Sequence, residues 1–131
     1  MSGLEFLGNE RRGSPLKGAS ILDPIEQNAL KEALNRIWDQ VMPLMKERLA
    51  LLDNAAAAFS ANQLSDSQHE EANAAAHKLA GVLGTFGLTR GTVLARELEM
   101  MYSRDGGPDP ALGARLASIA AELRTIIENR K

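Results

Sequence analysis

The chain has 131 residues and no cysteine, and its 15 lysines and arginines nearly balance its 17 aspartates and glutamates. This composition excludes disulfides and thiolate metal sites, and without a basic block nucleic acid is not expected as a partner. No apolar run reaches the ~20 residues that a membrane-spanning helix needs, and the start of the chain lacks the basic and apolar regions of a secretory signal. We therefore expect a cytoplasmic protein with one core and no membrane partner.

Residues 1–22 carry no sustained hydrophobic periodicity and are interrupted by glycine and proline, which predicts a flexible N-terminal tail. Asp23 followed by Pro24 is typical of a helix start, with the cap and the first-turn proline in their usual places. The helical pattern continues to Pro43, where it should bend or restart because proline has no backbone donor. The apolar positions of this segment are Leu30, Leu34, Ile37 and Val41.

Further helical patterns cover residues 44–59, 65–86 and 89–103, and a last one begins at Asp109. In each of them apolar residues recur every three or four positions, which predicts amphipathic helices that share one core. Trp38 and the methionines are expected in the core as well. The other residues expected to face it are Leu44, Leu49, Leu52, Ala56, Phe59, Ala72, Ala75, Leu79, Val82, Leu83, Phe86, Leu94, Leu98, Leu112, Leu116, Ile119, Leu123 and Ile126.

Start and stop signals separate these helices. Ser65 and Gln68 have the spacing of a capping box, and Gly87 is expected to end the same helix. No segment alternates with period two, so no strand is expected. The sequence predicts an all-α fold over residues 23–131: an antiparallel four-helix bundle, monomeric by default, with an extra N-terminal helical segment before Pro43.

Residues 76–88 read AHKLAGVLGTFGL and place His77 in the middle of a helix, with glycines four and seven residues later. A glycine inside a helix costs about 1 kcal/mol relative to alanine, so Gly81 and Gly84 suggest that something approaches the ring closely. His77 is expected to point away from the core into solvent. Its neighbours on that face would be small apart from one asparagine: Asn73, Ala74, Ala80, Gly81 and Gly84.

The run around His77 closely resembles the signature of histidine-containing phosphotransfer (Hpt) domains of two-component signalling. The resemblance covers about residues 30–128 and is sharpest over 76–99. It implies that His77 accepts a phosphoryl group from a histidine kinase or a receiver-domain aspartate, and passes it to another receiver aspartate. Imidazole suits this role because its neutral, nucleophilic form is available at cytoplasmic pH. Magnesium and the acid chemistry would belong to the receiver, so the chain is expected to be a phosphoryl carrier with no cofactor, no metal site and no kinase activity of its own.

Glu99 lies 22 residues after His77. In the phosphotransfer domains of chemotaxis-type kinases, which this part of the chain resembles, a glutamate at that spacing orients the histidine. The resemblance therefore implies that the Glu99 carboxylate fixes the proton on one ring nitrogen of His77.

The chain departs from the commonest family pattern in its positive charge. Many members carry a lysine three residues after the histidine, where this chain has Ala80. Lys78 directly follows the histidine and could attract phosphate, and Arg90 or Arg96 of the next helix are further candidates.

Other interpretations stay open. The alanine in place of lysine is compatible with a helical scaffold that binds a receiver or kinase domain without transferring phosphate, and Gly84 could simply serve helix packing. His69-Glu70 begins like a zinc-protease motif, but that motif needs a histidine where this chain has Asn73. His77 would lie about 12 Å further along the helix, so His69 is expected to be a solvated polar residue.

Overall fold

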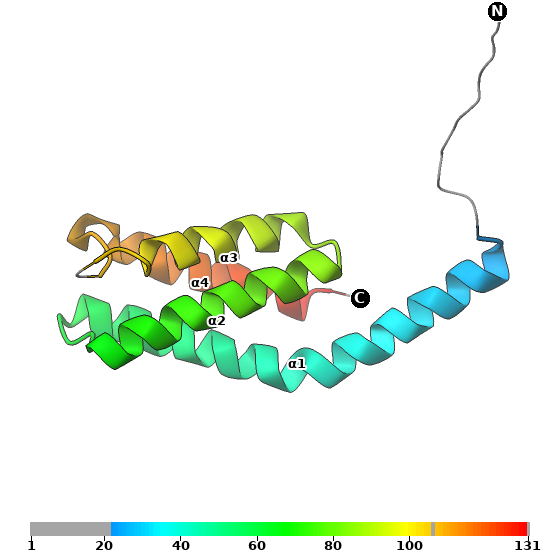
Figure 1. The fold of residues 1–131 in the computed structure, drawn as a ribbon, viewed down its shortest axis with the longest axis horizontal. Helices are drawn as coiled ribbons and strands as arrows, with labels where there is room; N and C mark the ends of the chain where they lie inside the picture. Colours follow the sequence, from blue (N-terminus) through cyan, green and yellow to red (C-terminus); the bar gives the residue numbers. More distant parts are fainter. Residues whose placement is uncertain (1–21, 106, 131) are drawn as a thin grey trace, which may run out of the picture. The chain divides into compact units, whose positions relative to one another are not determined.

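The computed structural model describes residues 22–105 and 107–130. These residues form α1 (Pro24–Ser60), α2 (Asp66–Thr85), α3 (Thr89–Met101), the short 3-10 helix η2 (Pro110–Leu112) and α4 (Gly113–Glu128), as Figure 1 shows. No strand occurs among them, and the predicted all-α fold is confirmed. Residues 1–21 of the predicted N-terminal tail lie outside the described part of the chain.

The chain divides into two units between Trp38 and Asp39, inside α1. In the first unit, α1 begins at the predicted cap. The Asp23 carboxylate accepts a hydrogen bond from the Glu26 amide at 2.8 Å, and the Glu26 carboxylate accepts one from the Asp23 amide at 3.2 Å. These two reciprocal bonds satisfy two of the backbone donors that a helix start leaves without partners. At the end of the same unit, Trp38 is buried, as predicted.

The predicted segment before Pro43 is helical, and the helix does not restart at the proline, because α1 runs through it. Proline removes one backbone donor, so the carbonyl of Asp39 loses its usual partner, while the ladder continues on both sides. Leu30 and Ile37 are 51% and 46% exposed. Their helical spacing therefore does not mark a fully buried face.

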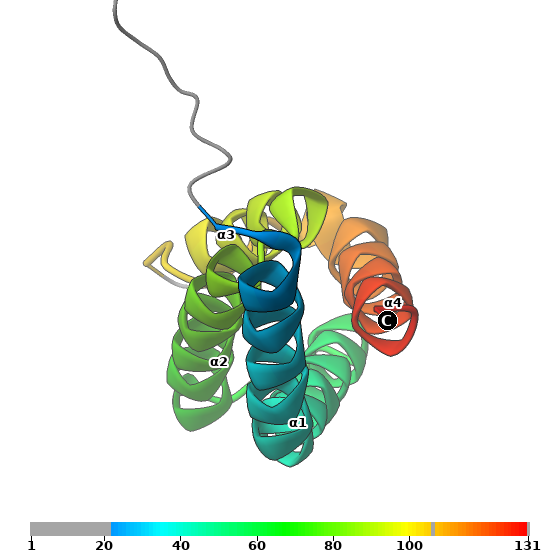
Figure 2. The same ribbon diagram turned by 90° about the vertical axis from the view of Figure 1, so that its right-hand side faces the viewer.

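Within the second unit, residues 39–131, the C-terminal part of α1 and the helices α2, α3 and α4 form the predicted antiparallel bundle, seen almost end-on in Figure 2. Arg124 of α4 donates a hydrogen bond to Asp53 of α1. The core of this unit consists of Met45, Leu49, Leu52, Ala55, Ala56, Ala72, Ala75, Ala76, Leu79, Ala80, Leu83, Leu94, Ala95, Leu98, Met101, Tyr102, Leu116, Ile119, Ala120, Leu123 and Ile127.

Some predicted core positions lie at the edge of that core. Val82, Phe86 and Phe59 are only half-buried. Leu44 is 48% exposed, and Met100 is 70% exposed.

On the last helix the predicted buried positions Leu116, Ile119 and Leu123 are confirmed, and only the two ends of the stripe differ. Leu112 is 37% exposed, and Ile127 is buried in place of the half-buried Ile126. The predicted helix started at Asp109, but the residues after it form the short η2 turn, and α4 begins at Gly113.

Small residues let α3 pack closely against its neighbours. Four of the six buried residues of α2 are alanines. A Cβ atom added at Gly91 of α3 would lie 3.0 Å from Leu83 Cδ1 of α2 and 3.4 Å from Ile126 Cγ2 of α4. These distances are tighter than most Cβ contacts, so a side chain at position 91 would require Leu83 to shift by a few tenths of an ångström.

The connection between α2 and α3 is a tight turn of three residues, 86–88. Gly87 has φ +71°, its amide donates to the Gly84 carbonyl at 3.1 Å, and the Leu88 amide donates to the Leu83 carbonyl at 2.9 Å. This pair of bonds is a Schellman motif. The prediction that Gly87 ends the helix is confirmed, and the motif sets how α3 returns along α2.

Replacing Gly87 by alanine should lower the free energy of unfolding by about 1 kcal/mol, because an L-residue is strained at positive φ. Urea unfolding followed by circular dichroism at 222 nm measures this change. Gly81→Ala is the matched control: Gly81 lies inside α2 with nothing within 4 Å of an added Cβ, so alanine should raise stability by about 0.5–1 kcal/mol. Equal effects of the two substitutions would contradict this explanation.

Candidate functional site

His77 and Glu99 meet on the outer face of the α2–α3 pair. His77 lies near the middle of α2, and its side chain is 68% exposed, whereas the Glu99 side chain is 27% exposed. His77 Nδ1 lies 2.7 Å from Glu99 Oε2. The antiparallel helices thus bring together two residues that are 22 positions apart in the sequence.

The short distance assigns different roles to the two ring nitrogens. A carboxylate only accepts hydrogen bonds, so the proton of a neutral His77 ring lies on Nδ1. The lone pair of Nε2 is then left free on the exposed side of the ring. A neutral imidazole held in this tautomer is a nucleophile with a fixed direction of attack.

The two glycines leave the surface beside the ring open. Gly81 is exposed, with nothing within 4 Å of an added Cβ, and a Cβ at Gly84 would lie 3.7 Å from Thr92 Oγ1 of α3. The latter distance is an ordinary contact, so close helix packing does not require a glycine at position 84. Both glycines therefore leave free space on the side of α2 that carries His77.

Asn73 was expected only as a surface neighbour of the histidine, but it bonds to the same glutamate. Its side-chain amide donates to the backbone carbonyl of Glu99 at 2.8 Å, in a part-buried position. Asn73 lies one helical turn before His77, so α2 contacts Glu99 through two side chains on the same face. No residue type signals this bond, because its acceptor is a main-chain atom.

The prediction that Ala80 lies on the exposed face beside His77 is wrong, because Ala80 is only 1% exposed. The buried face of α2 is wider than the predicted stripe and includes Ala76 and Ala80, since the close neighbours on both sides cover small side chains. Position 80 is therefore a core position on this backbone.

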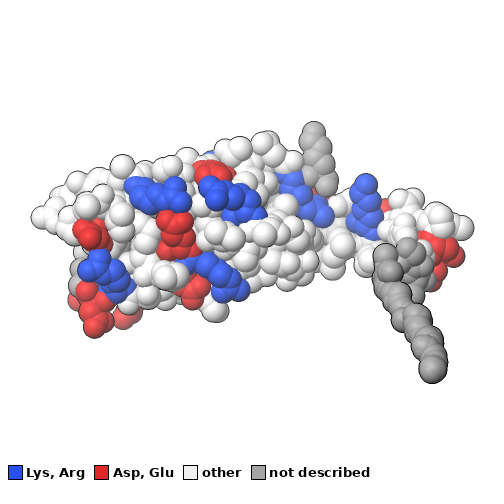
Figure 3. Space-filling model, turned by 90° about the horizontal axis from the view of Figure 1, so that it is seen from above, with Lys and Arg blue, Asp and Glu red and all other residues white. Residues whose placement is uncertain are grey.

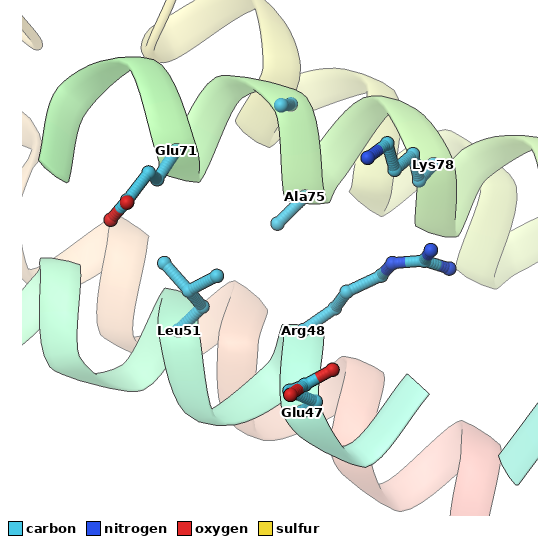
Figure 4. A pocket seen from close by; sticks show the side chains of 7 residues that line it. Glu47, Arg48, Leu51, Glu71, Ala75 and Lys78 are labelled. Carbon is cyan, nitrogen blue, oxygen red and sulfur yellow. The ribbon is translucent and has the colours of Figure 1, made fainter. Parts of the chain in front are cut away.

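Lys78 faces away from the Glu99 side of α2, into a groove between α1 and α2 (Figure 4). Arg48 of α1 extends towards it from the opposite wall, and Glu47 and Glu71 line the same groove. Within the described residues neither cation takes part in an ion pair. Arg48 was not identified from the sequence, because only the packing of α1 on α2 brings it near Lys78.

The two arginines considered on α3 differ in their surroundings. Arg90 donates to both carboxylate oxygens of Glu122 on α4, at 2.9 and 3.3 Å, and these bonds hold the pKa of Glu122 below its usual range. Arg96 is exposed and belongs to no ion pair among the described residues. It lies four residues after Thr92 and three before Glu99, so these three residues form one stripe along α3.

Charges of both signs alternate over the face of the bundle that Figure 3 shows, and no large patch of one sign appears there. Charged side chains also pair between helices, such as Arg115 of α4 with Glu97 of α3 at 2.8 Å. The charge of Arg115 is thereby engaged away from the histidine.

His69 is not the solvated residue that the sequence suggested. Its Nε2 is buried without a hydrogen-bond partner in the structure, and its ring packs against Tyr102 at 6.2 Å between centroids. Burial raises the pKa of Tyr102 to about 12. His69 therefore contributes to packing near the C-terminal end of α3, two turns of α2 away from His77.

The described residues contain no group of three or more histidine, cysteine, aspartate or glutamate side chains that could hold a metal ion. The same residues include no helix that is both long and apolar enough to cross a membrane.

The family model of the Hpt domain matches residues 36–130. The chain belongs to the Hpt domain family. Histidine phosphotransfer in two-component signalling is the activity of such domains, and their partners are histidine kinases and receiver domains.

Protein RcaC of Microchaete diplosiphon is 39% identical to this Hpt domain over 66 residues, which are 50% of this chain and 10% of that protein. The chain thus matches about a tenth of the length of this relative. No solved structure matches the chain.

Replacing Glu99 by alanine should let the proton of the neutral His77 ring distribute over both nitrogens, because Nδ1 loses its acceptor. Nitrogen-15 NMR of the imidazole ring distinguishes the two tautomers directly. Glu97→Ala serves as the control, since it removes a carboxylate from α3 that pairs with Arg115 instead. If Glu99→Ala left the ring in the Nδ1–H form, the hydrogen bond to Glu99 would not control the tautomer.

Proposed function

We propose that this Hpt domain accepts a phosphoryl group on Nε2 of His77 and exchanges it with the aspartate of a response-regulator receiver domain. The donor is a phosphorylated receiver domain, a histidine kinase or a hybrid kinase. Phosphoryl transfer takes place in the cytoplasm, where the phosphoryl group originates from ATP. The observation that carries this proposal is the 2.7 Å contact between His77 Nδ1 and Glu99, which leaves Nε2 exposed and unprotonated.

Phosphoryl transfer to His77 requires no proton to move to or from any other group of this chain. The Nε2 lone pair attacks the phosphorus of the aspartyl phosphate, the bond from phosphorus to the aspartate oxygen breaks, and the carboxylate leaves with the electron pair. The ring, which keeps its Nδ1 proton, becomes positively charged, and Glu99 stabilises that charge across the hydrogen bond. In the reverse direction the ring leaves as neutral imidazole.

The shape of the surface supports a protein as the phosphoryl donor. An aspartyl phosphate lies in a folded receiver domain, so in-line attack requires that two protein surfaces approach each other within a few ångströms of the ring. Gly81 and Gly84 place no side chain on the His77 side of α2 at the two positions, one and two turns after the histidine, that share its face. A large side chain at either position would stand between the surfaces.

Arg96 is the candidate for the positive charge that the family usually places three residues after the histidine. His77 faces Glu99, and Gly84 faces Thr92, so the antiparallel register places Arg96 between these two pairs, opposite Ala80 and next to Gly81. Its guanidinium belongs to no ion pair within the described part of the chain and can reach over the open surface of Gly81. It would neutralise phosphoryl oxygens held on Nε2.

Incubation with a phosphorylated receiver domain, or with a cognate kinase and ATP, should label the wild type with acid-labile, base-stable phosphate, whereas His77→Gln should stay unlabelled. His69→Gln, which replaces the other histidine of the chain, should keep the label. Label on His77→Gln would mean that the phosphoryl group is carried by a residue other than His77. Binding of several receivers without any label on the wild type would favour a scaffold that does not transfer phosphate.

Arg96→Ala should slow transfer to His77 about tenfold, near the lower end of the effect of removing a charge-stabilising group, because the site is open to solvent. Arg90→Ala is the matched control, since Arg90 is bonded to Glu122, and it should leave the rate within about twofold. Rapid-quench measurement of labelled protein gives both rates. A larger loss for Lys78→Ala than for Arg96→Ala would assign the charge to the groove between α1 and α2 instead.

A further inference from the structure

The C-terminal turn of α3 contains a carbonyl that the helix itself leaves without a partner. The last four carbonyls of an α-helix have no intrahelical donor, and Glu99 lies two residues before the end of α3. The Tyr102 amide donates to Leu98, and the Ser103 amide, which would continue the ladder to Glu99, donates to Met100 at 3.2 Å. The Glu99 carbonyl is satisfied by another helix.

The donor comes from α2, one turn before the histidine. Asn73 Nδ2 lies 2.8 Å from the Glu99 carbonyl oxygen in a part-buried position. Glu99 is therefore held at two points by the same face of α2, at its main chain by Asn73 and at its carboxylate by His77. With its main chain fixed, the glutamate side chain has fewer ways to leave the ring.

We propose that Asn73 is a positioning residue for phosphotransfer, which acts through Glu99 to hold His77 in the tautomer with the proton on Nδ1. Its consequence for the transfer rate depends on the function proposed above. Asn73 touches no reacting atom. Partners of this kind, one shell away from the functional group, change activity by about 10–100-fold when removed.

The competing explanation is that the bond only caps α3 and adds stability. Ser65→Ala is the matched control for that role. It removes the side-chain acceptor of the α2 cap, which the Gln68 amide reaches at 3.1 Å. It thus weakens α2, the helix that carries Asn73, without touching Glu99, so it should lower stability while leaving the ring tautomer unchanged.

Two substitutions at position 73 test the proposal. Asn73→Ala removes the donor, and Asn73→Asp keeps the shape but presents only acceptor oxygens to a carbonyl. Both should reduce the fraction of His77 rings in the Nδ1–H tautomer, seen by nitrogen-15 NMR, and both should slow labelling of His77 about tenfold. Unfolding curves of all variants show whether a lower tautomer fraction or a lower labelling rate is accompanied by reduced stability.

A wild-type tautomer pattern in Asn73→Ala and Asn73→Asp would overturn the proposal, as would an equal change in Ser65→Ala. The two readouts separate this proposal from the previous one. If the wild type accepts no phosphate, the proposed function fails, while the ring spectra still decide whether Asn73 positions Glu99. If the wild type is labelled on His77 and the spectra do not respond to position 73, only the role of Asn73 is lost.

Discussion

The close packing of α3 on α2 is the constraint on which the rest of the site depends. Alanines at the buried positions of α2 and the glycine at position 91 remove the side-chain volume that usually separates two helices. Interaxial distance follows the size of the residues at the contact. Only at a short separation can the glutamate of one helix hydrogen-bond to the histidine of the other while the histidine stays exposed. The small residues therefore serve the chemistry as well as the core.

The site combines a rigid side with an open side. On the rigid side, the Glu99 carboxylate and main chain are both tied to α2. On the open side, the exposed ring edge is followed by two glycines with little around them. A phosphoryl carrier needs this division: the ring must keep its orientation through repeated gain and loss of a charged group, and the partner must reach it without displacing the residues that orient it.

The sequence predicted the features that depend on local chemistry or on regular spacing. The capping box of α2, the stop at Gly87 and the exposure of His77 each follow from a few neighbouring residues. The pairing of His77 with Glu99 came from a spacing seen in a family, and the structure supplies its physical reason in two antiparallel helices joined by a three-residue turn.

What could not be predicted depends on tertiary contacts. A helical wheel gives directions but not the width of the buried face, and Ala80 was therefore placed on the wrong side of its boundary. The bond from Asn73 ends on a main-chain oxygen, which every residue has, so no residue type reveals it. Arg48 approaches Lys78 only because α1 packs on α2. A proline signal, finally, does not distinguish a helix that stops from one that continues, as α1 does through Pro43.

The tight turn at Gly87 has a consequence for how the protein is assembled and how it can vary. Because of it, the histidine, the glutamate, the asparagine and both glycines all lie on a single helical hairpin, and the hydrogen bonds of His77 and Asn73 to Glu99 span 22 and 26 residues. Closing a loop of that length costs less chain entropy than joining segments from the two ends of the chain. Neither α1 nor α4 contributes a side chain to the bonds among His77, Glu99 and Asn73, so their outer surfaces can change without removing these bonds.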